Sequence, residues 1–193
     1  LVGRDVERLD LAGCNRATLE SLSENLSDGV VSPLIWLTLV GIPGMLAFKV
    51  ISTMDSMVGY RNSRYLRFGW FGARTDDLMN WVPARLTWVL LSISAWVLPG
   101  YDGRMAWSIG LSQHQYMSGP NAGWGQAASA GALRVQLVGE KWKNGRLQHN
   151  AWLGHSDDPA QVGADSIARL IRLNRYATLL LLVILSLLIA VFN

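Results

Sequence analysis

The stretch YATLLLLVILSLLIAVF, Tyr176–Phe192, decides the fold class of this chain. It carries no charge, and its length of about 17 residues is near the lower limit for a helix that spans a bilayer. Arg169, Arg172 and Arg175 precede it, and nothing basic follows. The positive-inside rule places that basic flank in the cytoplasm and the C-terminus outside. We therefore expect an integral membrane protein.

The composition supports a membrane environment. Of the 193 residues, 50% are apolar and only 16% are charged, whereas a soluble domain carries about a quarter charged residues. Nine Trp fit the headgroup level of a membrane, which Trp favours. A very apolar soluble core is the alternative. The net charge of +3 is small and dispersed, so nucleic acid is not an expected partner.

The sequence also lacks the motifs of several soluble enzyme classes. The single Cys14 excludes an internal disulfide and a cysteine zinc cluster, and we interpret it as an ordinary helix residue. His114, His149 and His155 have no metal-ligand spacing and are predicted to lie in loops. No phosphate-binding P-loop, zinc-protease helix or hydrolase nucleophile elbow occurs.

Two further apolar segments are interrupted or short. Residues Val30–Ile51 form a segment that contains Pro33, Gly41, Pro43, Gly44 and Lys49. Proline and glycine free backbone groups in a membrane helix, so this segment predicts a broken helix, a type that often lines sites. The segment Trp81–Leu98 either re-enters the membrane or spans it with Arg85 snorkelling to the interface.

The remaining segments complete an all-α, polytopic membrane helix bundle with broken or re-entrant helices and polar loops. Residues Gly123–Leu133 are small and uncharged, which predicts a helix packed inside the bundle. Residues Asp165–Asn174 predict an amphipathic helix, and Val138–Asp158 predict a loop or short hairpin. We expect one domain over residues 1–193.

A first acidic motif, ESLSENLSDG, covers residues 20–29. On a helix, Glu20, Glu24, Ser27 and Asp28 share one face at spacings of three and four, and the like charges repel. A Mg²⁺ ion or an arginine cluster would compensate this repulsion. The alternative is a solvated acidic face, and in either case Gly29 is predicted to end the helix.

A second motif, Met54–Asn62, follows the broken helix directly and contains Asp55 and Arg61. The planar guanidinium of Arg61 suits a carboxylate or a phosphate. The alternative is a juxtamembrane turn with a positive-inside arginine.

A third motif, Arg74–Arg85, begins RTDDLMN. On a helix, Asp76 and Asp77 both reach Asn80, and such oxygen ligands suit Mg²⁺ that is shared with substrate phosphates. The alternative is a helix start at which the helix dipole favours acidic residues.

A fourth motif, Gly119–Gly125, has the sequence GPNAGWG. Its turn exposes backbone N–H groups that suit an anion, and a small-residue helix follows. A plain Gly/Pro turn explains it as well.

Together the motifs resemble the cobalamin-biosynthesis CobD/CbiB family of membrane proteins. The matching strings are Val2–Asp5, Glu20–Pro33, Asp55–Asn62, Asp76–Thr87 and Pro120–Trp124. Their order and spacing also agree over most of the chain. Gly125 stands where the family commonly has Pro, and Met105–Ser118 is unlike the usual polar loop. Family members are longer, so the resemblance implies that this chain lacks N-terminal membrane segments.

The resemblance implies an adenosylcobinamide-phosphate synthase, a ligase that forms a carbon–nitrogen bond. Such an enzyme joins adenosylcobyric acid to (R)-1-amino-2-propanol phosphate, or to ethanolamine phosphate, in an ATP-dependent reaction. ATP and Mg²⁺ are the implied cofactors, and a corrinoid is the substrate. The expected partners are the lipid bilayer, these substrates and other late enzymes of the pathway. The expected location is the inner membrane, multi-pass, with the site near the cytoplasmic face.

The motifs also predict roles for individual residues in this reaction. The expected Mg²⁺ ligands are Asp76, Asp77, Glu24 and Asp28. Glu20 is the predicted general base if burial raises its pKa, and Asp55 joins the catalytic acids. A phosphate or carboxylate group of a substrate is predicted to bind to Arg61, Arg74 and Arg85. Further substrate contacts are assigned to Asn25, Tyr60, Asn62, Asn80, Asn121 and Trp124.

Two other classes stay open. A membrane sensor or regulator like the distantly related AmpE proteins would bind without catalysis. A transporter is suggested by the broken helix, although transporters usually carry ionisable groups in mid-span, and here they cluster at segment ends.

Overall fold

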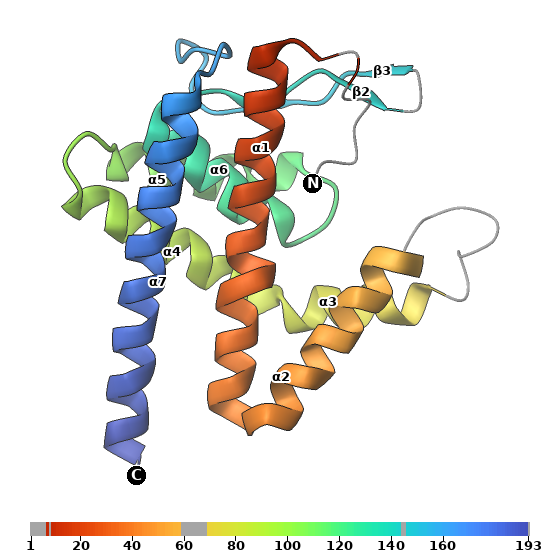
Figure 1. Ribbon diagram of the computed structural model, residues 1–193, viewed down its shortest axis with the longest axis vertical. Coiled ribbons are helices and arrows are strands. Elements are labelled where there is room, and N and C mark those ends of the chain that lie inside the picture. Colours follow the sequence, from red (N-terminus) through yellow and green to blue (C-terminus); the bar gives the residue numbers. More distant parts are fainter. Residues whose placement is uncertain (1–6, 8, 59–68, 144–145, 193) are drawn as a thin grey trace.

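The structure is a computed structural model, and it describes residues 7, 9–58, 69–143 and 146–192. It is mainly helical (Figure 1). The helices are α1 (Leu11–Leu26), the π-helical turn η2 (Ser27–Val31), α2 (Ser32–Val58), α3 (Trp70–Met79), α4 (Trp81–Val97), α5 (Gly103–Gln113), the 3₁₀ turn η3 (His114–Tyr116), α6 (Ala122–Leu133) and α7 (Ala164–Phe192). The strands are β1 (Leu137–Val138), β2 (Lys141–Lys143), β3 (Arg146–Gln148) and β4 (Trp152–Leu153).

The first helix runs on through the acidic motif. Asp10 caps it, because the Asp10 Oδ1 accepts the Gly13 N–H at 2.7 Å. The prediction that Gly29 ends the helix is wrong. A terminating glycine needs the left-handed conformation, and Gly29 does not adopt it. The chain instead forms η2 and continues into α2. A π-helical turn adds a residue to the helix, which rotates the side chains that follow it.

The predicted break in the second apolar segment is confirmed at Gly41. Gly41 has φ 75° and ψ −164°, a conformation that glycine adopts without the strain of a Cβ. Pro43 lies in the first turn after the break, where a missing N–H costs no hydrogen bond. The two limbs of α2 therefore run in different directions, and the second limb returns toward α3 (Figure 1).

Helix α7 is a single element of 29 residues. The predicted helix over residues 165–174 is confirmed, and it continues into the apolar stretch without a break. The buried stripe of α7 consists of Leu170, Leu173, Ala177 and Leu181. Ile171 lies beside this stripe and is 38% exposed.

Within the described residues, two helical stretches are long and apolar enough to cross a membrane. They are Leu11–Met57, which contains the Gly41 break, and Ala164–Val191. Helix α4 is apolar but shorter. Helix α1 and helix α7 lie side by side (Figure 1).

Helix α6 is the centre of the core, and its position inside the bundle is confirmed. Every residue from Gly123 to Leu133 is buried. A Cβ at Gly131 would collide with the carbonyl of Met105, so the glycine allows α5 to pack closely. Trp88 and Trp124 are also buried here. These two tryptophans therefore pack inside the protein, and the expectation that tryptophans mark the headgroup level stays a prediction.

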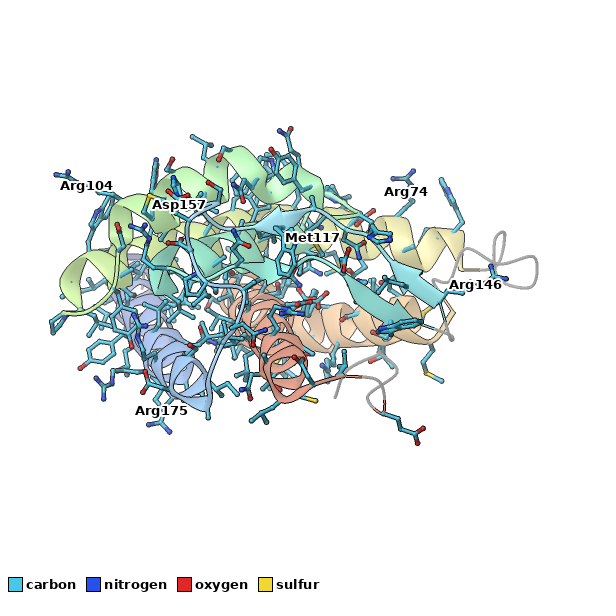
Figure 2. All side chains as sticks on the ribbon, turned by 90° about the horizontal axis from the view of Figure 1, so that it is seen from above. Arg74, Arg104, Met117, Arg146, Asp157 and Arg175 are labelled. Atoms are coloured by element: carbon cyan, nitrogen blue, oxygen red, sulfur yellow. The ribbon has the colours of Figure 1, made fainter. Side chains whose placement is uncertain are left out.

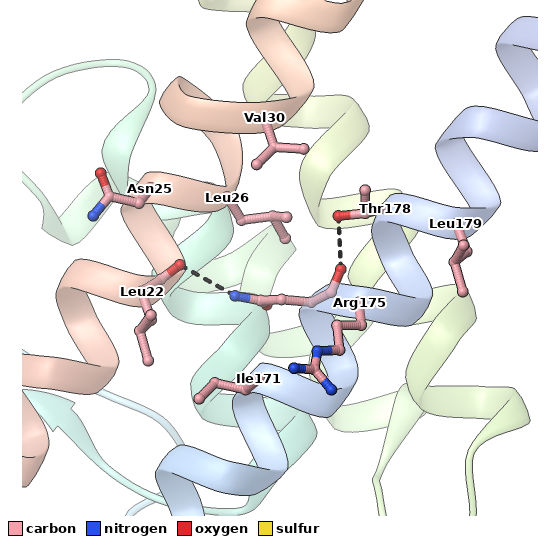
Figure 3. A pocket seen from close by; sticks show the side chains of 9 residues that line it. Leu22, Asn25, Leu26, Val30, Ile171, Arg175, Thr178 and Leu179 are labelled. Carbon is pink, nitrogen blue, oxygen red and sulfur yellow. Dashed lines mark hydrogen bonds between the residues drawn. The ribbon is translucent and has the colours of Figure 1, made fainter.

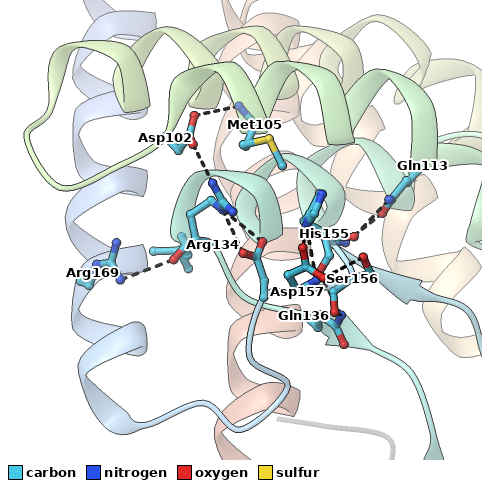
Figure 4. Close-up of polar contacts among 12 residues, drawn as sticks. Asp102, Met105, Gln113, Arg134, Gln136, His155, Ser156, Asp157 and Arg169 are labelled. Atoms are coloured by element: carbon cyan, nitrogen blue, oxygen red, sulfur yellow. Dashed lines mark hydrogen bonds and ion pairs between the residues drawn. The ribbon is translucent and has the colours of Figure 1, made fainter.

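A polar cluster fixes the C-terminal end of α6 (Figure 4). Arg134 has φ 57° and ends the helix. Its guanidinium donates to Asp158 at 2.9 Å and to Asp102 at 3.2 Å. The predicted hairpin is confirmed as β2 paired with β3, and β1 pairs with β4.

Candidate functional site

Four carboxylates from four elements gather where α1, η2, α2 and α3 meet. Asp28 lies within electrostatic range of Glu24, Asp55 and Asp76. Asp76 also lies within range of Asp55 and Asp77. The π-helical turn sets the direction of Asp28, and the return of α2 after Gly41 brings Asp55 to the same place. We call Glu24, Asp28, Asp55 and Asp76 the acidic cluster.

Asn80 joins this cluster to the wall of α2. Its side chain is 2% exposed. The Ser32 hydroxyl donates to Asn80 Oδ1 at 2.5 Å, and Asn80 Nδ2 donates to Asp76 Oδ2 at 3.1 Å. Trp36 Nε1 donates to the Met79 carbonyl at 3.3 Å beside this pair. The predicted contact between Asp76 and Asn80 is thereby confirmed.

Asp76 keeps one oxygen uncommitted. Its Oδ1 is sealed from solvent and accepts no hydrogen bond from the described residues. Burial raises the pKa of Asp76 above the ordinary carboxyl value, the hydrogen bond from Asn80 lowers it, and the charges of Asp55 and Asp77 raise it further. The net result is a carboxyl that accepts a proton more readily than an exposed one. A pKa raised in this way is typical of acid–base residues.

The predicted Mg²⁺ ligands do not converge. In the part of the chain that the structure describes, no three His, Cys, Asp or Glu side chains are grouped closely enough to hold a metal ion. Asp77 carries its carboxylate 3.8 Å from the Arg74 guanidinium. The oxygen donors suit Mg²⁺ chemically, but their placement does not fit a preformed metal site. The assignment to Glu24, Asp28, Asp76 and Asp77 stays a prediction.

Glu20 has a contact that the sequence does not predict. It is buried, with 7% of its surface exposed, and its Oε1 accepts the Val138 N–H at 3.1 Å. Val138 has φ 69°, a strained value for a β-branched residue. The carboxylate therefore fixes strand β1 against α1, a structural task for the residue predicted to be the general base.

The start of α6 contacts the junction of α3 and α4. Asn121 Nδ2 donates to the Asp77 carbonyl at 2.8 Å. The Trp124 ring stacks on the His114 ring with centroids 3.7 Å apart. The Arg85 guanidinium lies 5.0 Å from the Trp124 ring centroid and 4.0 Å from that of Trp81. The structure thus puts Trp124 against Arg85 and Asn121 against Asp77, and substrate binding by these residues stays a prediction.

The turn before α6 packs against other parts of the chain. A Cβ at Gly123 would collide with the carbonyl of His114, so the glycine is needed for close packing. Asn121 Oδ1 is buried and accepts no hydrogen bond from a described residue. His114, predicted to be a loop residue, lies in the 3₁₀ turn η3. Anion binding by the turn stays a prediction.

Asn25 and Arg74 lie at more exposed positions. Asn25 lines a groove of about 530 Å³ between α1 and α7 (Figure 3). In this groove Asn174 Nδ2 donates to the Leu22 carbonyl at 3.2 Å. The side chain of Arg74 is 62% exposed and projects outward (Figure 2). The predicted substrate contacts Tyr60, Arg61 and Asn62 lie outside the described residues.

Ser32 is a site residue that sequence reasoning missed. It precedes Pro33 in the matching string Glu20–Pro33, which gave it no particular role. Its hydroxyl meets Asn80 across 48 positions of sequence. A serine before a proline in an apolar segment is also an ordinary helix start, so no local signal separates the two roles.

Comparisons with known proteins agree with the motifs. A family model described as "CobD/Cbib protein" matches residues 1–174. The cobalamin biosynthesis protein CobD of Yersinia enterocolitica is 42% identical over 187 residues, which cover 97% of this chain and 58% of that protein. The CobD protein of Geobacter metallireducens is 50% identical over 139 residues, covering 72% of this chain and 43% of that protein. The CobD protein of Rhodobacter capsulatus is 44% identical over 160 residues, covering 82% and 49%.

The chain therefore spans little more than half the length of the curated relatives that it matches. No solved structure matches it.

Proposed function

The chain belongs to the CobD/Cbib family, and from this premise we propose that it acts in cobalamin biosynthesis as an adenosylcobinamide-phosphate synthase. The reaction joins adenosylcobyric acid to (R)-1-amino-2-propanol phosphate or ethanolamine phosphate through an amide bond. Because the chain spans 58% of the first relatives, the activity and the substrates of the whole protein are part of the proposal.

The acidic cluster is the observation that carries this proposal. It contains an Asp76 oxygen without a partner among the described residues, Arg85 follows Asp76 closely along the chain, and Trp124 lies against Arg85 in space. Amide synthesis with a phosphorylated amine needs both a proton acceptor and a cation for the phosphate. A carboxyl with a raised pKa supports acid–base chemistry at this cluster.

The chemistry fixes which tasks the residues must perform. A carboxylate resists attack by an amine because its leaving group is poor. The carboxylate oxygen of adenosylcobyric acid first attacks the terminal phosphorus of ATP, which releases ADP and gives an acyl phosphate. The neutral amine then attacks the acyl carbon, and inorganic phosphate leaves as the carbon–nitrogen bond is completed. The ammonium form of the substrate must therefore lose a proton before attack.

Asp76 takes the role of general base in this proposal, in place of Glu20. Its Oδ1 is uncommitted and its pKa is raised, whereas Glu20 Oε1 is occupied by Val138. Asn80 holds Asp76 in position through Oδ2. The Arg85 guanidinium, held between Trp81 and Trp124, would bind the phosphate of the amine substrate.

ATP and Mg²⁺ enter the proposal as a complex that arrives from solution. The described acidic residues do not form a preformed metal site. Mg²⁺ on the phosphates of ATP would supply charge neutralisation during phosphoryl transfer. No ligand geometry is assigned to it.

The proposed location is the inner membrane, with several membrane segments and the site near the cytoplasmic face. The reversal of the chain at Gly41 supports a re-entrant hairpin. The hydrogen bond from Asn174 to Leu22 puts this turn of α1 beside the basic flank of α7. Asp28 follows Leu22 by about 9 Å along the helix, which supports a site near the membrane face that carries this flank.

A direct assay tests the proposal. The full chain, purified in detergent, is supplied with adenosylcobyric acid, MgATP and each amino-alcohol phosphate, and the product is measured by mass spectrometry. We expect adenosylcobinamide phosphate and ADP in equal amounts. Asp76→Asn should lower kcat at least about a hundredfold, while Asp157→Asn, at an exposed and distant carboxylate, should not. Binding of adenosylcobyric acid without turnover would instead support the sensor alternative, which the names of the relatives do not favour.

A further inference from the structure

Two cavities follow one another along the seam between α4 and α7. The first, of about 240 Å³, is lined by Tyr101, Asp165, Arg169 and Arg172 among others. The second, of about 230 Å³, is lined mainly by Ile93, Val97, Tyr176, Leu179 and Val183. The first is polar and the second apolar, so the seam changes its chemistry along its length.

The polar cavity and the apolar cavity follow each other in the same spatial order along α4 and along α7. On α7 the polar cavity uses residues 165–172 and the apolar cavity residues 176–183. Their midpoints are 11 residues apart, which is about 16 Å along a helix. This distance is close to half the thickness of a hydrocarbon core, about 15 Å. Helix α4 runs antiparallel to α7, so the order along its sequence is reversed. Residues 93–97 of α4 line the apolar cavity, and residues 99–101 after it line the polar cavity.

Arg169 and Tyr101 form a fixed wall of the polar cavity. Arg169 donates to the Gly100 carbonyl at 2.6 Å and reaches the Leu133 carbonyl (Figure 4). Its guanidinium lies 5.3 Å from the Tyr101 ring centroid. The Tyr101 hydroxyl donates to the Arg169 carbonyl at 2.8 Å. These groups are committed to one another.

Arg172 and Asp165 are the uncommitted charges of the same cavity. Neither forms a hydrogen bond or an ion pair with a described residue, although both act electrostatically on Tyr101. Seven residues separate them, about 10 Å along the helix. Arg172 is nearer to the apolar cavity and Asp165 is farther from it. From the apolar cavity toward the N-terminal end of α7, the lining therefore changes from apolar to cationic and then to anionic.

We propose that the α4–α7 seam binds a phospholipid with an ethanolamine headgroup. The acyl chain fills the apolar cavity between Val97 and Leu179, the phosphate pairs with Arg172, and the ammonium pairs with Asp165. The order of groups in this lipid, from the membrane outward, is the order of partners along α7. A guanidinium and a carboxylate are the charge complements of the phosphate and the ammonium.

A soluble amino-alcohol phosphate carries the same two charges as this headgroup. It would occupy the polar cavity alone and leave the apolar cavity without an occupant. The apolar cavity next along the same seam therefore points to the lipid. The larger groove between α1 and α7 offers Arg175 and two asparagines but no carboxylate among its lining residues. It has no complement for the ammonium, which makes Arg175 a matched control on the same helix.

Native mass spectrometry of the full chain in mild detergent tests the proposal. Phosphatidylethanolamine, phosphatidylglycerol and phosphatidylcholine are added at equal concentration. We expect one bound phosphatidylethanolamine, preferred over the others by roughly tenfold. Arg172→Gln should lower binding of all three lipids by roughly five- to tenfold. Asp165→Asn should remove the preference for phosphatidylethanolamine but leave the phosphate contact. Arg175→Gln should change neither result.

Filling the apolar cavity provides a second variant. Val183→Trp should displace the lipid while the helical circular dichroism and the elution volume stay unchanged, because Val183 lines the apolar cavity and not the groove between α1 and α7. Three outcomes would overturn the proposal. These are equal binding of the three lipids, displacement of the lipid by millimolar ethanolamine phosphate, and a lipid-free dimer that Val183→Trp converts to a monomer. The first means non-selective solvation, the second a soluble ligand, and the third a second copy of the chain on this seam.

Discussion

The Ser32 hydroxyl donates a hydrogen bond of 2.5 Å to Asn80 Oδ1 across 48 residues of sequence. The bond connects the first limb of α2 to the end of α3, and Asn80 passes the connection to Asp76 at 3.1 Å. The only carboxyl oxygen of Asp76 left uncommitted among the described residues is Oδ1. The direction of the proposed general base is therefore set by a buried amide that contacts no substrate in the proposal.

Replacing this amide should cost both stability and activity. Asn80→Leu keeps the branched shape and the number of side-chain heavy atoms but leaves the buried Ser32 hydroxyl and Asp76 Oδ2 without their partner. We expect the free energy of unfolding to fall by about 1–3 kcal/mol, measured by thermal denaturation in detergent. Ser112→Ala removes an exposed hydroxyl that bonds the carbonyl of Ser108 and should have little effect. An unchanged melting temperature in Asn80→Leu would contradict the role of the amide.

Because the pKa of Asp76 is raised, ionisation of this carboxyl as pH rises should lower the stability of the fold and increase the activity. A carboxyl whose folded pKa is raised stabilises the fold most below its unfolded pKa, and this contribution is lost as pH rises through the folded pKa. Asp76→Asn should therefore be more stable than the wild type at neutral pH, even though it is inactive. In the wild type, kcat should rise with pH as Asp76 ionises. A stability difference that does not depend on pH would contradict this prediction.

Arg134 should be important for stability rather than for chemistry. The side chain of Asp158 is 5% exposed, so Arg134→Ala leaves a buried carboxylate without its cation. We expect a lower melting temperature, with little change in the Michaelis constants of the remaining folded enzyme. Arg104→Ala, at an exposed arginine on α5, is the matched control (Figure 2). Equal melting temperatures of the two variants would argue against this role.

The same cluster predicts an acid sensitivity. Partial burial raises the pKa of Asp102, but the Met105 N–H and the Arg134 guanidinium outweigh this effect, so its pKa lies below the ordinary value. Stability from Asp102 is present above the unfolded pKa and is lost as pH falls through the folded pKa. Unfolding curves between neutral and acidic pH should show a steeper loss in the wild type than in Asp102→Asn.

The re-entrant hairpin predicts a labelling pattern. In a Cys14→Ala background, Thr18→Cys on α1 and Ser56→Cys at the end of α2 occupy exposed positions. Both should react with a membrane-impermeant maleimide from the same side, because Gly41 reverses the chain. A cysteine appended after residue 193 should react from the opposite side. Labelling of positions 18 and 56 from opposite sides would mean that α2 crosses the membrane.

Several local elements of the structure were predicted correctly from the sequence. The break at Gly41, the buried helix over residues 123–133 and the β2–β3 hairpin follow from glycine, proline and small residues in the sequence. These features depend on conformational preferences of neighbouring residues. The end of the first helix was predicted wrongly at Gly29, which stays helical within η2.

The sequence by itself determined that Tyr176–Phe192 is an apolar stretch and that Glu24, Asp28, Asp55 and Asp76 are acidic residues beside apolar segments. Only the tertiary structure decided which of them meet, and that Glu20 bonds to Val138 across 118 residues. The physical reason is that a local sequence sets backbone preference and polarity, whereas the partner of a buried polar group depends on how distant helices pack. A π-helical turn at residues 27–31 and a glycine reversal at residue 41 set that packing here.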